Sequence, residues 1–330
     1  MPDQLEIDNL TVSFGAEGAP PVLDGVSLGV AKGEVLAIVG ESGSGKSMTA
    51  MSVMKLLPRG ARMKAGGIRF DGVDILGADE RTMNRIRGDR VSMLFQQPKR
   101  MLDPTATVGR QVAEPLRRYA GLSRHKAADR VIELLSDVGI AEPERRAKAY
   151  AHQLSGGIAQ RVMIAMALAG EPELLIADEP TTALDVTVEV QVLRLIATKR
   201  AELGMSVLFI SHDLGVVSSL ADRIAVMYAG RIVEVGTTDQ ILRQPQHPYT
   251  RSLIKCATLA RELDGSLFVI PGDVSSARSI TKGCRFMPRC PVVEEAHLHD
   301  SCDAEEPPLS GCANGQVSRC WATIETRRSA

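Results

Sequence analysis

The sequence has 330 residues, of which 44% are hydrophobic and 24% charged, the balance of an ordinary globular protein, and this excludes an intrinsically disordered chain. Its 39 basic and 40 acidic residues give a formal net charge of −1, so it lacks the overall positive charge typical of nucleic-acid-binding proteins. Its longest apolar stretches, such as residues 162–170, are much shorter than the roughly 20 residues that a membrane-spanning helix requires.

The N-terminal quarter of the chain predicts strands around one helix. The first ten residues, MPDQLEIDNL, lack the basic segment and apolar core of a secretory signal, so we expect a cytoplasmic chain with a peripheral membrane role at most. Residues 5–14 alternate apolar and polar side chains, and residues 34–40 form a continuous apolar run typical of a buried strand. Residues 45–57 have helical spacing, and residues 66–75 return to strand-like alternation.

Strands alternate with helices from residue 91 to about residue 243, which predicts a mostly parallel sheet. Residues 100–153 carry Arg-, Lys- and Glu-rich helical patterns, which we interpret as an all-helical insertion. The composition changes near Gln244, where a predicted helix over about 249–263 precedes a Pro-, Gly- and Cys-rich tail. The predicted strands are residues 91–95, 173–180, 206–211, 223–228 and 230–236, and a long helix is predicted over residues 186–203.

GESGSGKS, residues 40–47, fits the phosphate-loop pattern G-x-x-x-x-G-K-[ST] and lies between a predicted strand and a predicted helix. In such a loop, backbone N–H groups and the helix N-terminus bind phosphates, Lys46 adds a positive charge, and the Ser47 hydroxyl reaches Mg²⁺. A chance glycine-rich turn is the alternative. The predicted ATP-binding residues here are Gly40, Ser42, Gly43, Gly45, Lys46, Ser47 and Met48.

Polar side chains at the ends of two further strands suit phosphoryl transfer. In LLIADEP, Asp178 can hold Mg²⁺ through water and Glu179 can act as the general base for the attacking water. Gln96, which follows strand 91–95, can contact both the metal and that water. The carboxyl ends of buried parallel strands meet at one sheet edge, so we expect these residues near the phosphate loop. Taken alone, the Asp-Glu pair would be a solvated turn and Gln96 a polar strand terminus.

Two single residues are weaker candidates for the same site. His212 follows the predicted strand 206–211, where its imidazole could orient the γ-phosphate and the water, or simply cap the strand end. Phe14 ends the first strand and could stack on adenine, or belong to the core of a chain that is only 3% aromatic. We predict a catalytic role for His212 and an adenine contact for Phe14.

LSGGIAQR, residues 154–161, places a second glycine-rich anion site at the start of a predicted helix. One nucleotide offers a single γ-phosphate, so we predict that this second site covers a nucleotide held by another subunit in a head-to-tail pair. ATP would then join the two subunits, and hydrolysis would release them. The predicted residues of this site are Leu154, Ser155, Gly156, Gly157 and Gln160.

The segments GESGSGKS, FQQP, LSGGIAQR, LLIADEP, TALD and SHD, in that order, resemble the nucleotide-binding subunits of ABC transporters over about residues 5–240. The resemblance implies an α/β P-loop NTPase fold with an ABC-type core sheet, a small antiparallel β subdomain and a helical subdomain at about residues 97–170. It also implies that Asp185, in TALD, lies at the subunit interface. We therefore divide the chain into an ATPase domain, residues 1–243, and a cysteine-rich C-terminal extension, residues 244–330.

Three segments are similar to sequences of the dipeptide/oligopeptide-permease branch of importers: LSGGIAQRVMIAMAL, EPTTALDVTVEVQVLRL and the QHPYT that follows the core. This similarity implies a homologous second ATPase, giving a heterodimer, beneath two membrane-spanning permeases at the cytoplasmic face of the inner membrane, with an extracytoplasmic solute-binding protein and no nucleic acid. The solute stays open among peptides, opines, glycosides and nickel chelates. The alternatives are an exporter, a regulatory ATP switch, or an ABC-type ATPase of DNA repair or translation, which would need a long coiled-coil insertion or tandem nucleotide domains.

Five of the six cysteines lie within the last fifty residues, a pattern that in a reducing compartment favours metal binding over disulfides. Zinc sites usually contain Cys pairs two to four residues apart, and five residues separate Cys284 from Cys290, so the spacing disfavours Zn²⁺ without excluding it. The importer branch resembled here often carries such a pattern with a [4Fe–4S] cluster, which we therefore prefer. The predicted ligands are Cys284, Cys290, Cys302 and Cys320, with Cys312 competing for the last place.

Overall fold

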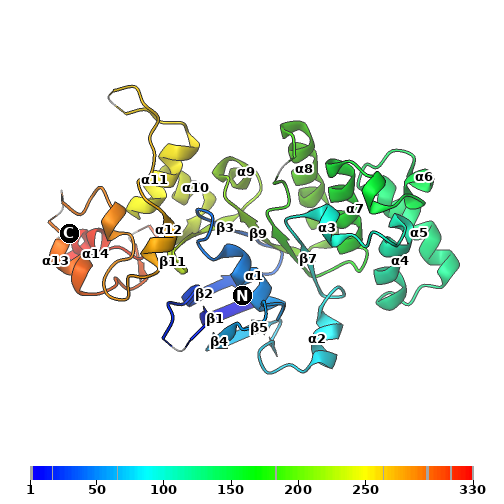
Figure 1. Ribbon diagram of the computed structural model, residues 1–330, viewed down its shortest axis with the longest axis horizontal. Helices are drawn as coiled ribbons and strands as arrows, with labels where there is room; N and C mark the ends of the chain where they lie inside the picture. The colour runs from blue at the N-terminus through cyan, green and yellow to red at the C-terminus, as the bar shows by residue number, and fades with distance from the viewer. Residues whose placement is uncertain are drawn as a thin grey trace. The chain divides into compact units, whose positions relative to one another are not determined.

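The computed structural model (Figure 1) describes residues 3–16, 18–64, 66–182, 184–262, 264–294, 297–312 and 314–328. The chain forms two compact units: unit 1 contains residues 1–31, 35–76 and 210–330, and unit 2 contains residues 32–34 and 77–209. The boundary that we placed at residue 243 from composition lies inside unit 1. Within the described part of the chain, no helix combines the length and apolar character that crossing a membrane requires.

An antiparallel sheet forms the N-terminal part of unit 1. Its strands, in the order β2-β1-β5-β6 with β4 also paired to β1, are β1 (Leu5–Ser13), β2 (Leu23–Val30), β4 (Arg62–Lys64), β5 (Gly67–Phe70) and β6 (Val73–Asp74). Leu5 lies opposite both Val30 and Phe70 in the register, and all three side chains are buried. The alternation of the sequence therefore places one face of this sheet in the core.

Strands of a second sheet complete the β structure of unit 1. In the order β12-β13-β11-β10-β3 they are β3 (Val35–Val39), β10 (Arg223–Tyr228), β11 (Arg231–Thr237), β12 (Ser310–Gly311) and β13 (Val317–Ser318). Strands β3 and β10 are parallel, and all five residues of β3 are buried, as its apolar run predicts. Strand β13 pairs with β11, with Val317 opposite Val235, so the C-terminal tail extends the sheet.

The helices of unit 1 begin with α1 (Lys46–Val53), directly after the glycine-rich loop that follows β3. Pro248 fits the first turn of α11 because its φ angle is already helical, and His247 caps that helix by accepting a hydrogen bond from Tyr249 N at 3.0 Å. The other helices are α9 (Leu214–Ser218), α10 (Thr238–Arg243), α11 (Pro248–Ala257), α12 (Val274–Ala277), η2 (Met287–Arg289), α13 (His299–Ala304) and α14 (Trp321–Arg328).

The helix that we predicted over 249–263 is too long at its C-terminal end. Helix α11 ends at Ala257, and Leu259 has a left-handed backbone with φ of +51° that cannot continue a helix. Beyond it, Arg261 pairs with Leu267 in an isolated antiparallel bridge.

Unit 2 contains the parallel strands β7 (Val91–Leu94) and β8 (Leu174–Asp178). Strand β9 (Ser206–Ser211) is hydrogen-bonded to β8 on the side away from β7. The described chain between β7 and β8 is helical, and α5 shows why: Ala127, Val131, Leu134 and Leu135 recur at helical spacing and are buried. The helices are α2 (Glu80–Ile86), α3 (Pro98–Met101), α4 (Val108–Arg118), α5 (Arg124–Asp137), α6 (Pro143–Ala147), η1 (Ala151–Gln153), α7 (Gly156–Leu168) and α8 (Val186–Leu203).

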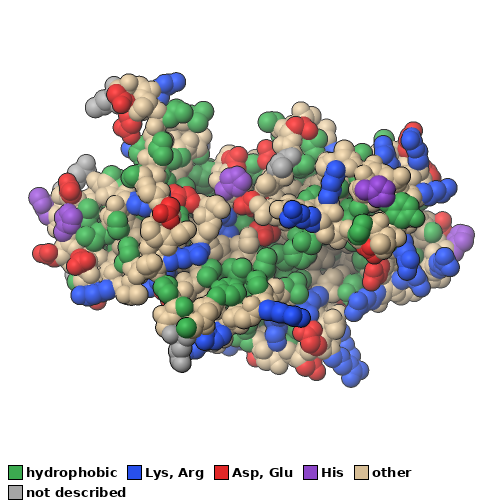
Figure 2. Space-filling model, viewed as in Figure 1, with side chains coloured by type: hydrophobic (Ala, Val, Ile, Leu, Met, Phe, Trp, Pro, Cys, Tyr) green, Lys and Arg blue, Asp and Glu red, His purple; other side chains and the backbone are tan. Residues whose placement is uncertain are grey.

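Basic and acidic side chains mingle on the outer surface of the α4–α6 segment, which carries no large patch of one sign in this view (Figure 2). Arg130 and Glu133 form one such pair on α5, and Arg145 and Glu142 form another at α6. This mixed surface is what a water-exposed helical face requires.

Candidate functional site

The loop between β3 and α1 has the shape that phosphate binding needs. Gly40 has φ of +153°, and a Cβ atom there would lie 2.1 Å from the Met227 carbonyl oxygen, so the loop accepts no side chain at this position. Gly45 precedes α1 with φ of +116°, where a Cβ would lie 2.7 Å from Leu23 Cδ2. These two glycines let the chain turn sharply from a buried strand into a helix N-terminus.

Lys46 is held inside this loop. Its side chain is 5% exposed, and Nζ donates hydrogen bonds to the carbonyl oxygens of Gly40, at 2.8 Å, and Glu41, at 3.1 Å. The ammonium is therefore fixed among the backbone groups that would face a phosphate, beside the positive end of the α1 dipole. The loop thus brings Lys46 together with the other residues of its motif, from Gly40 to Met48.

Unit 2 brings two other predicted residues into contact. Gln96 Nε2 donates a hydrogen bond to Glu179 Oε2 at 2.7 Å, and Thr182 Oγ1 donates to the same oxygen at 2.9 Å. Asp178, the last residue of β8, is buried with 3% exposure. The structure therefore places a carboxylate with two hydrogen-bond donors directly after the end of a buried strand.

The backbone of Glu179 is left-handed, with φ of +47°. Such a conformation costs a residue with a Cβ atom roughly 1–2 kcal/mol, and non-glycine residues that adopt it concentrate at functional sites. The turn directs the Glu179 side chain to Gln96 and Thr182 instead of continuing the strand.

The second glycine-rich motif begins a helix, as predicted. Ser155 is the N-cap of α7 and accepts a hydrogen bond from Ile158 N at 3.4 Å, while Leu154 and Gln160 are buried. A Cβ on Gly157 would lie 3.1 Å from Val188 Cγ1, so the start of α7 packs closely on the start of α8.

Asp185 is the N-cap of α8 and accepts a hydrogen bond from Val188 N at 2.9 Å. Both caps, Asp185 and Ser155, are exposed, as is Gly156 at the first position of α7. Two apolar side chains one turn apart on α8 are also exposed, Val186 at 75% and Val190 at 40%. This part of unit 2 therefore presents two helix N-termini and an apolar strip at the surface.

The two weaker candidates lie at strand ends, as predicted. His212 directly follows β9 and is exposed, and the neighbouring Asp213 caps α9 by accepting a hydrogen bond from Gly215 N at 2.7 Å. Phe14 directly follows β1 and is half-buried. The catalytic role of His212 and the adenine contact of Phe14 stay predictions.

Four cysteines from separate segments of unit 1 line one small apolar cavity: Cys284, Cys290, Cys302 and Cys320. Among the described residues that line it, Cys312 is absent. Burial raises the pKa of Cys284 to about 12 and also raises the pKa values of Cys290 and Cys320, so it disfavours the thiolate forms of these three side chains. Within the described residues, no three His, Cys, Asp or Glu side chains are placed to hold a metal ion.

Two family models match the chain: the ABC transporter model over residues 23–182, and the C-terminal region of oligopeptide/dipeptide transporters over residues 233–296. A probable peptide ABC transporter ATP-binding protein of Sinorhizobium fredii is 45% identical over 324 residues, which is 97% of this chain and 95% of that protein. The chain belongs to the ATP-binding proteins of ABC transporters. A putative peptide import ATP-binding protein of Brucella ovis is also 45% identical, over 97% of this chain and 98% of that protein.

Solved ABC cassettes share the fold. A dimeric ATP-binding cassette in a post-hydrolysis state with ADP and phosphate matches with a TM-score of 0.64 and 30% identity, over 71% of this chain and 98% of that one. A component of an ABC transporter complex from Clostridium perfringens matches with a TM-score of 0.63 and 27% identity, over 74% of this chain and 92% of that one. The chain is therefore an ABC-type ATPase with the α/β cassette fold that its motifs predict.

The C-terminal contacts with the phosphate loop were missed from the sequence. Tyr249, Arg278 and Arg289 each donate to or accept from a residue of the loop. QHPYT marked Tyr249 as part of a family signature, but no local pattern linked any of these residues to a loop more than two hundred positions earlier.

Proposed function

We propose that this chain is the ATP-binding subunit of an importer that couples ATP hydrolysis to the uptake of di- and oligopeptides, or a similar small solute, across the cytoplasmic membrane. The observation that carries the proposal is the match of residues 233–296 to the C-terminal region of oligopeptide/dipeptide transporters, alongside the ATPase core. The names of the relatives agree with it. An exporter, or an ABC-type ATPase of DNA repair or translation, would not account for that C-terminal match.

The proposal is tested by purifying the chain from its native membrane with whatever binds it. We expect a second ATPase and two permeases to co-purify at the cytoplasmic face of the inner membrane. In vesicles, a peptide-loaded solute-binding protein is expected to stimulate ATP hydrolysis by this assembly. Association with nucleic acid or ribosomes in place of permeases would contradict the proposal.

Each motif has a role in this function. Phe14 contacts the adenine. The ATP phosphates are bound by the residues of the phosphate loop and the start of α1: Gly40, Ser42, Gly43, Gly45, Lys46, Ser47 and Met48. Ser47, Gln96 and Asp178 offer only oxygen ligands, which suits Mg²⁺, and the ion would neutralise phosphate charge when bound. Glu179 takes the proton of the attacking water, with Gln96 and Thr182 fixing its carboxylate, and His212 orients the γ-phosphate.

The second glycine-rich motif covers the nucleotide of the partner ATPase with Leu154, Ser155, Gly156, Gly157 and Gln160. Asp185 lies at the interface between the two ATPase subunits. The exposure of Ser155 and of the Val186 and Val190 strip supports this role, because an apolar strip beside an anion site suits a partner surface. We keep the division into an ATPase domain, residues 1–243, and a C-terminal extension, residues 244–330, as a proposal; the match to the C-terminal region of oligopeptide/dipeptide transporters begins ten residues before this boundary, at residue 233.

Ser155→Asp in this subunit alone is expected to lower hydrolysis of the nucleotide bound by the partner ATPase at least tenfold, because it places a negative charge against phosphate. Asp preserves the helix cap, and the neutral cap Asn at the same position is expected to have a much smaller effect. Single-turnover hydrolysis at each site of the mixed complex measures this.

Ser123→Asp is the matched control, because Ser123 caps α5 in the same unit and also accepts a backbone hydrogen bond at 3.4 Å. If Ser155→Asp slowed hydrolysis only of the nucleotide bound by this subunit, the assignment of Ser155 to the partner's site would be contradicted.

The cavity lined by Cys284, Cys290, Cys302 and Cys320 is proposed to hold a [4Fe–4S] cluster, with Zn²⁺ as the alternative. A cubane cluster takes one thiolate at each of its four irons, so its sulfur ligands surround a wider centre than one ion does. The four cysteines that line one apolar cavity are what supports the proposal. Among the described residues no three His, Cys, Asp or Glu side chains are placed to hold a metal ion, a finding that counts equally against the cluster and against Zn²⁺. The role is structural, because these sulfurs lie outside the ATPase motifs.

Cys290→Ser is expected to remove most of the iron and the absorbance at about 400 nm from anaerobically purified protein, from about four irons per chain. Cys312→Ser is the matched control and is expected to keep its iron, because Cys312 does not line the cavity among the described residues. Iron analysis and ATP binding are measured together, and ATP binding is expected to persist in both variants. Stoichiometric zinc without iron would overturn the cluster.

A further inference from the structure

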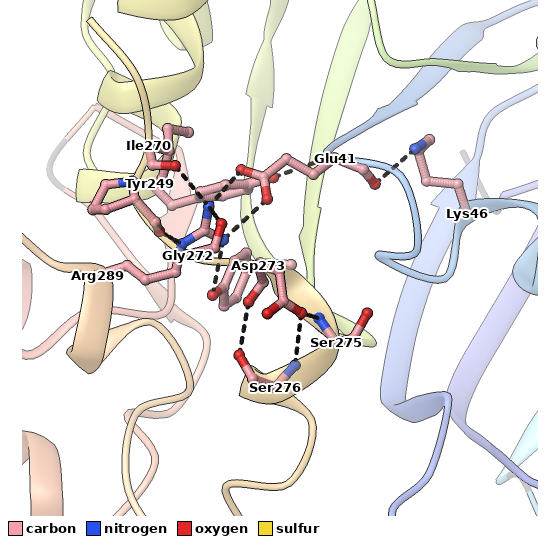
Figure 3. A network of polar contacts seen from close by, with 11 residues as sticks. Glu41, Lys46, Tyr249, Ile270, Gly272, Asp273, Ser275, Ser276 and Arg289 are labelled. Atoms are coloured by element: carbon pink, nitrogen blue, oxygen red, sulfur yellow. Dashed lines mark hydrogen bonds and ion pairs between the residues drawn. The ribbon is translucent and has the colours of Figure 1, made fainter.

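The C-terminal region, residues 244–330, contacts the phosphate loop of the same unit (Figure 3). Arg289 forms a two-pronged ion pair with Glu41, the second residue of that loop: Nη1 donates to Oε2 at 3.0 Å and Nη2 donates to Oε1 at 3.1 Å. The Arg289 side chain is 7% exposed and that of Glu41 is 25% exposed. Little solvent screens this pair, and its geometry is the strong bidentate form.

Arg289 is itself fixed by its surroundings. Its Nη2 also donates to the carbonyl oxygens of Ile270 and Gly272, each at 3.4 Å, and its Nη1 donates to Tyr228 Oη at 3.3 Å. Its guanidinium carbon lies 5.7 Å from the centre of the Tyr228 ring. Figure 3 shows these groups converging on the guanidinium from the chain around Gly272 on one side and the loop on the other. Arg289 therefore joins the C-terminal region rigidly to Glu41.

Tyr249 makes a second contact with the same loop residue. Its hydroxyl oxygen accepts a hydrogen bond from Glu41 N at 2.9 Å. The Tyr249 ring is fully buried and packs against Tyr228 and Phe286, with ring centres 4.6 and 5.3 Å away. Burial raises the pKa of Tyr249, so the hydroxyl stays protonated. The QHPYT segment thus sets the backbone of the phosphate loop.

Arg278 makes a third contact, donating from Nη2 to the carbonyl oxygen of Gly43. It directly follows α12, whose first turn is capped by Asp273 through the backbone N–H groups of Ser275, at 2.8 Å, and Ser276, at 3.0 Å (Figure 3). The C-terminal region therefore contacts the loop at the Glu41 carboxylate, the Glu41 N–H and the Gly43 carbonyl.

We propose that Arg289 and Tyr249 are positioning residues for ATP binding: they hold the phosphate loop in the conformation in which Gly40 and Glu41 retain Lys46. This rests on the proposal that the loop binds the ATP phosphates. A loop held in its binding conformation loses less conformational entropy when ATP arrives. The guanidinium also neutralises Glu41, whose carboxylate would otherwise repel the phosphates.

Arg289→Ala in the full-length chain is expected to raise the Kd for ATP about tenfold, as loss of a charge-assisted hydrogen bond predicts. At saturating ATP, kcat of the assembled complex is expected to stay within about twofold, because Arg289 touches no reacting atom. Adding Glu41→Gln to Arg289→Ala is expected to recover much of the affinity, because the unpaired carboxylate is gone. If Arg289→Ala acted by unfolding the C-terminal region, adding Glu41→Gln would not recover the affinity. A double variant that binds ATP no better than Arg289→Ala would therefore overturn the proposal.

Tyr249→Phe removes one oxygen and keeps the buried ring, so it tests the proposal in a chain that folds. Its Kd for ATP is expected to rise about threefold, and an unchanged Kd would contradict the role of Tyr249. Arg285→Ala is the matched control: Arg285 is buried four residues earlier and pairs with Asp24, outside the loop, at 2.6 Å. If Arg285→Ala raised the Kd for ATP as much as Arg289→Ala does, the cause would be a general loss of C-terminal structure, and the proposal would be overturned.

Lys46→Ala separates this inference from the proposed site. If Lys46→Ala leaves the Kd unchanged, the loop does not bind ATP and the proposed site fails. If Lys46→Ala weakens binding while Arg289→Ala and Tyr249→Phe do not, the site stands and the positioning role fails. Isothermal titration of each full-length variant with Mg·ATP gives every Kd in this comparison.

Discussion

Replacing Glu179 with Gln is expected to leave ATP bound and to slow its hydrolysis by about 10²–10⁴-fold, the range for loss of a general base. The amide has the shape of the carboxylate but cannot take a proton. Its Oε1 can still accept the hydrogen bonds that Gln96 and Thr182 donate to Glu179, so the local geometry is expected to persist. The ATP-bound pair of subunits is therefore expected to accumulate, because in the proposed mechanism the subunits separate only after hydrolysis.

Steady-state turnover of the assembled complex, the Kd for ATP and the fraction of associated subunits are measured together. Glu173→Gln is the matched control, because Glu173 immediately precedes the same strand, β8, and pairs with Arg90 at its opposite end from Glu179. We expect it to retain turnover. Hydrolysis by Glu179→Gln at nearly the wild-type rate would remove Glu179 from the role of general base.

The ATPase motifs could be predicted from the sequence because each depends on neighbouring residues. A buried strand, a tight turn and a helix N-terminus follow from the order of apolar residues and glycines around Gly40–Ser47. The N-caps Ser155 and Asp185 follow from residue type immediately before an apolar helix. The left-handed backbone of Glu179 was not predictable, because a Glu after a strand carries no signal for it.

The C-terminal region could not be predicted because its structure depends on contacts distant in sequence. Glu234 on β11 accepts hydrogen bonds from the backbone N–H groups of Gln246 and His247, at 2.7 and 2.9 Å, and from Gln316 at 3.3 Å. One buried carboxylate thus ties both ends of this region to the sheet. A two-residue strand such as β13 has no periodicity to detect, so composition alone indicated a Pro-, Gly- and Cys-rich tail without strands.

The cysteine cluster also shows that contacts between distant segments cannot be predicted from the sequence. The cysteine cluster in the sequence predicted the four residues that line the cavity, but it left Cys312 as a competitor for the last place. Only the fold separates Cys312 from the other four. The sequence could not show that Arg289, adjacent to Cys290, turns toward Glu41. Tertiary packing therefore connects the two features that the sequence presented as independent, the cysteine cluster and the phosphate loop.

Lys46→Ala is expected to raise the Kd for ATP about a hundredfold, since two to three kcal/mol is the scale of a hydrogen bond from a charged donor. In the proposed site the lysine contacts phosphates in the ground state and in the transition state, so its loss is expected to weaken binding in both. It also frees the carbonyl oxygens of Gly40 and Glu41 that Nζ now holds, at 2.8 and 3.1 Å, which loosens the loop before ATP arrives.

Lys55→Ala is the control for this variant. Lys55 lies just beyond the end of α1, and its Nζ donates to the carbonyl oxygen of Leu76 at 3.1 Å, away from the loop. Isothermal titration with Mg·ATP is expected to show wild-type affinity for Lys55→Ala and very weak binding for Lys46→Ala. The two central variants then separate binding from chemistry: Lys46→Ala loses affinity, whereas Glu179→Gln keeps it and loses turnover. Tight ATP binding by Lys46→Ala would mean that the nucleotide phosphates lie elsewhere on the chain.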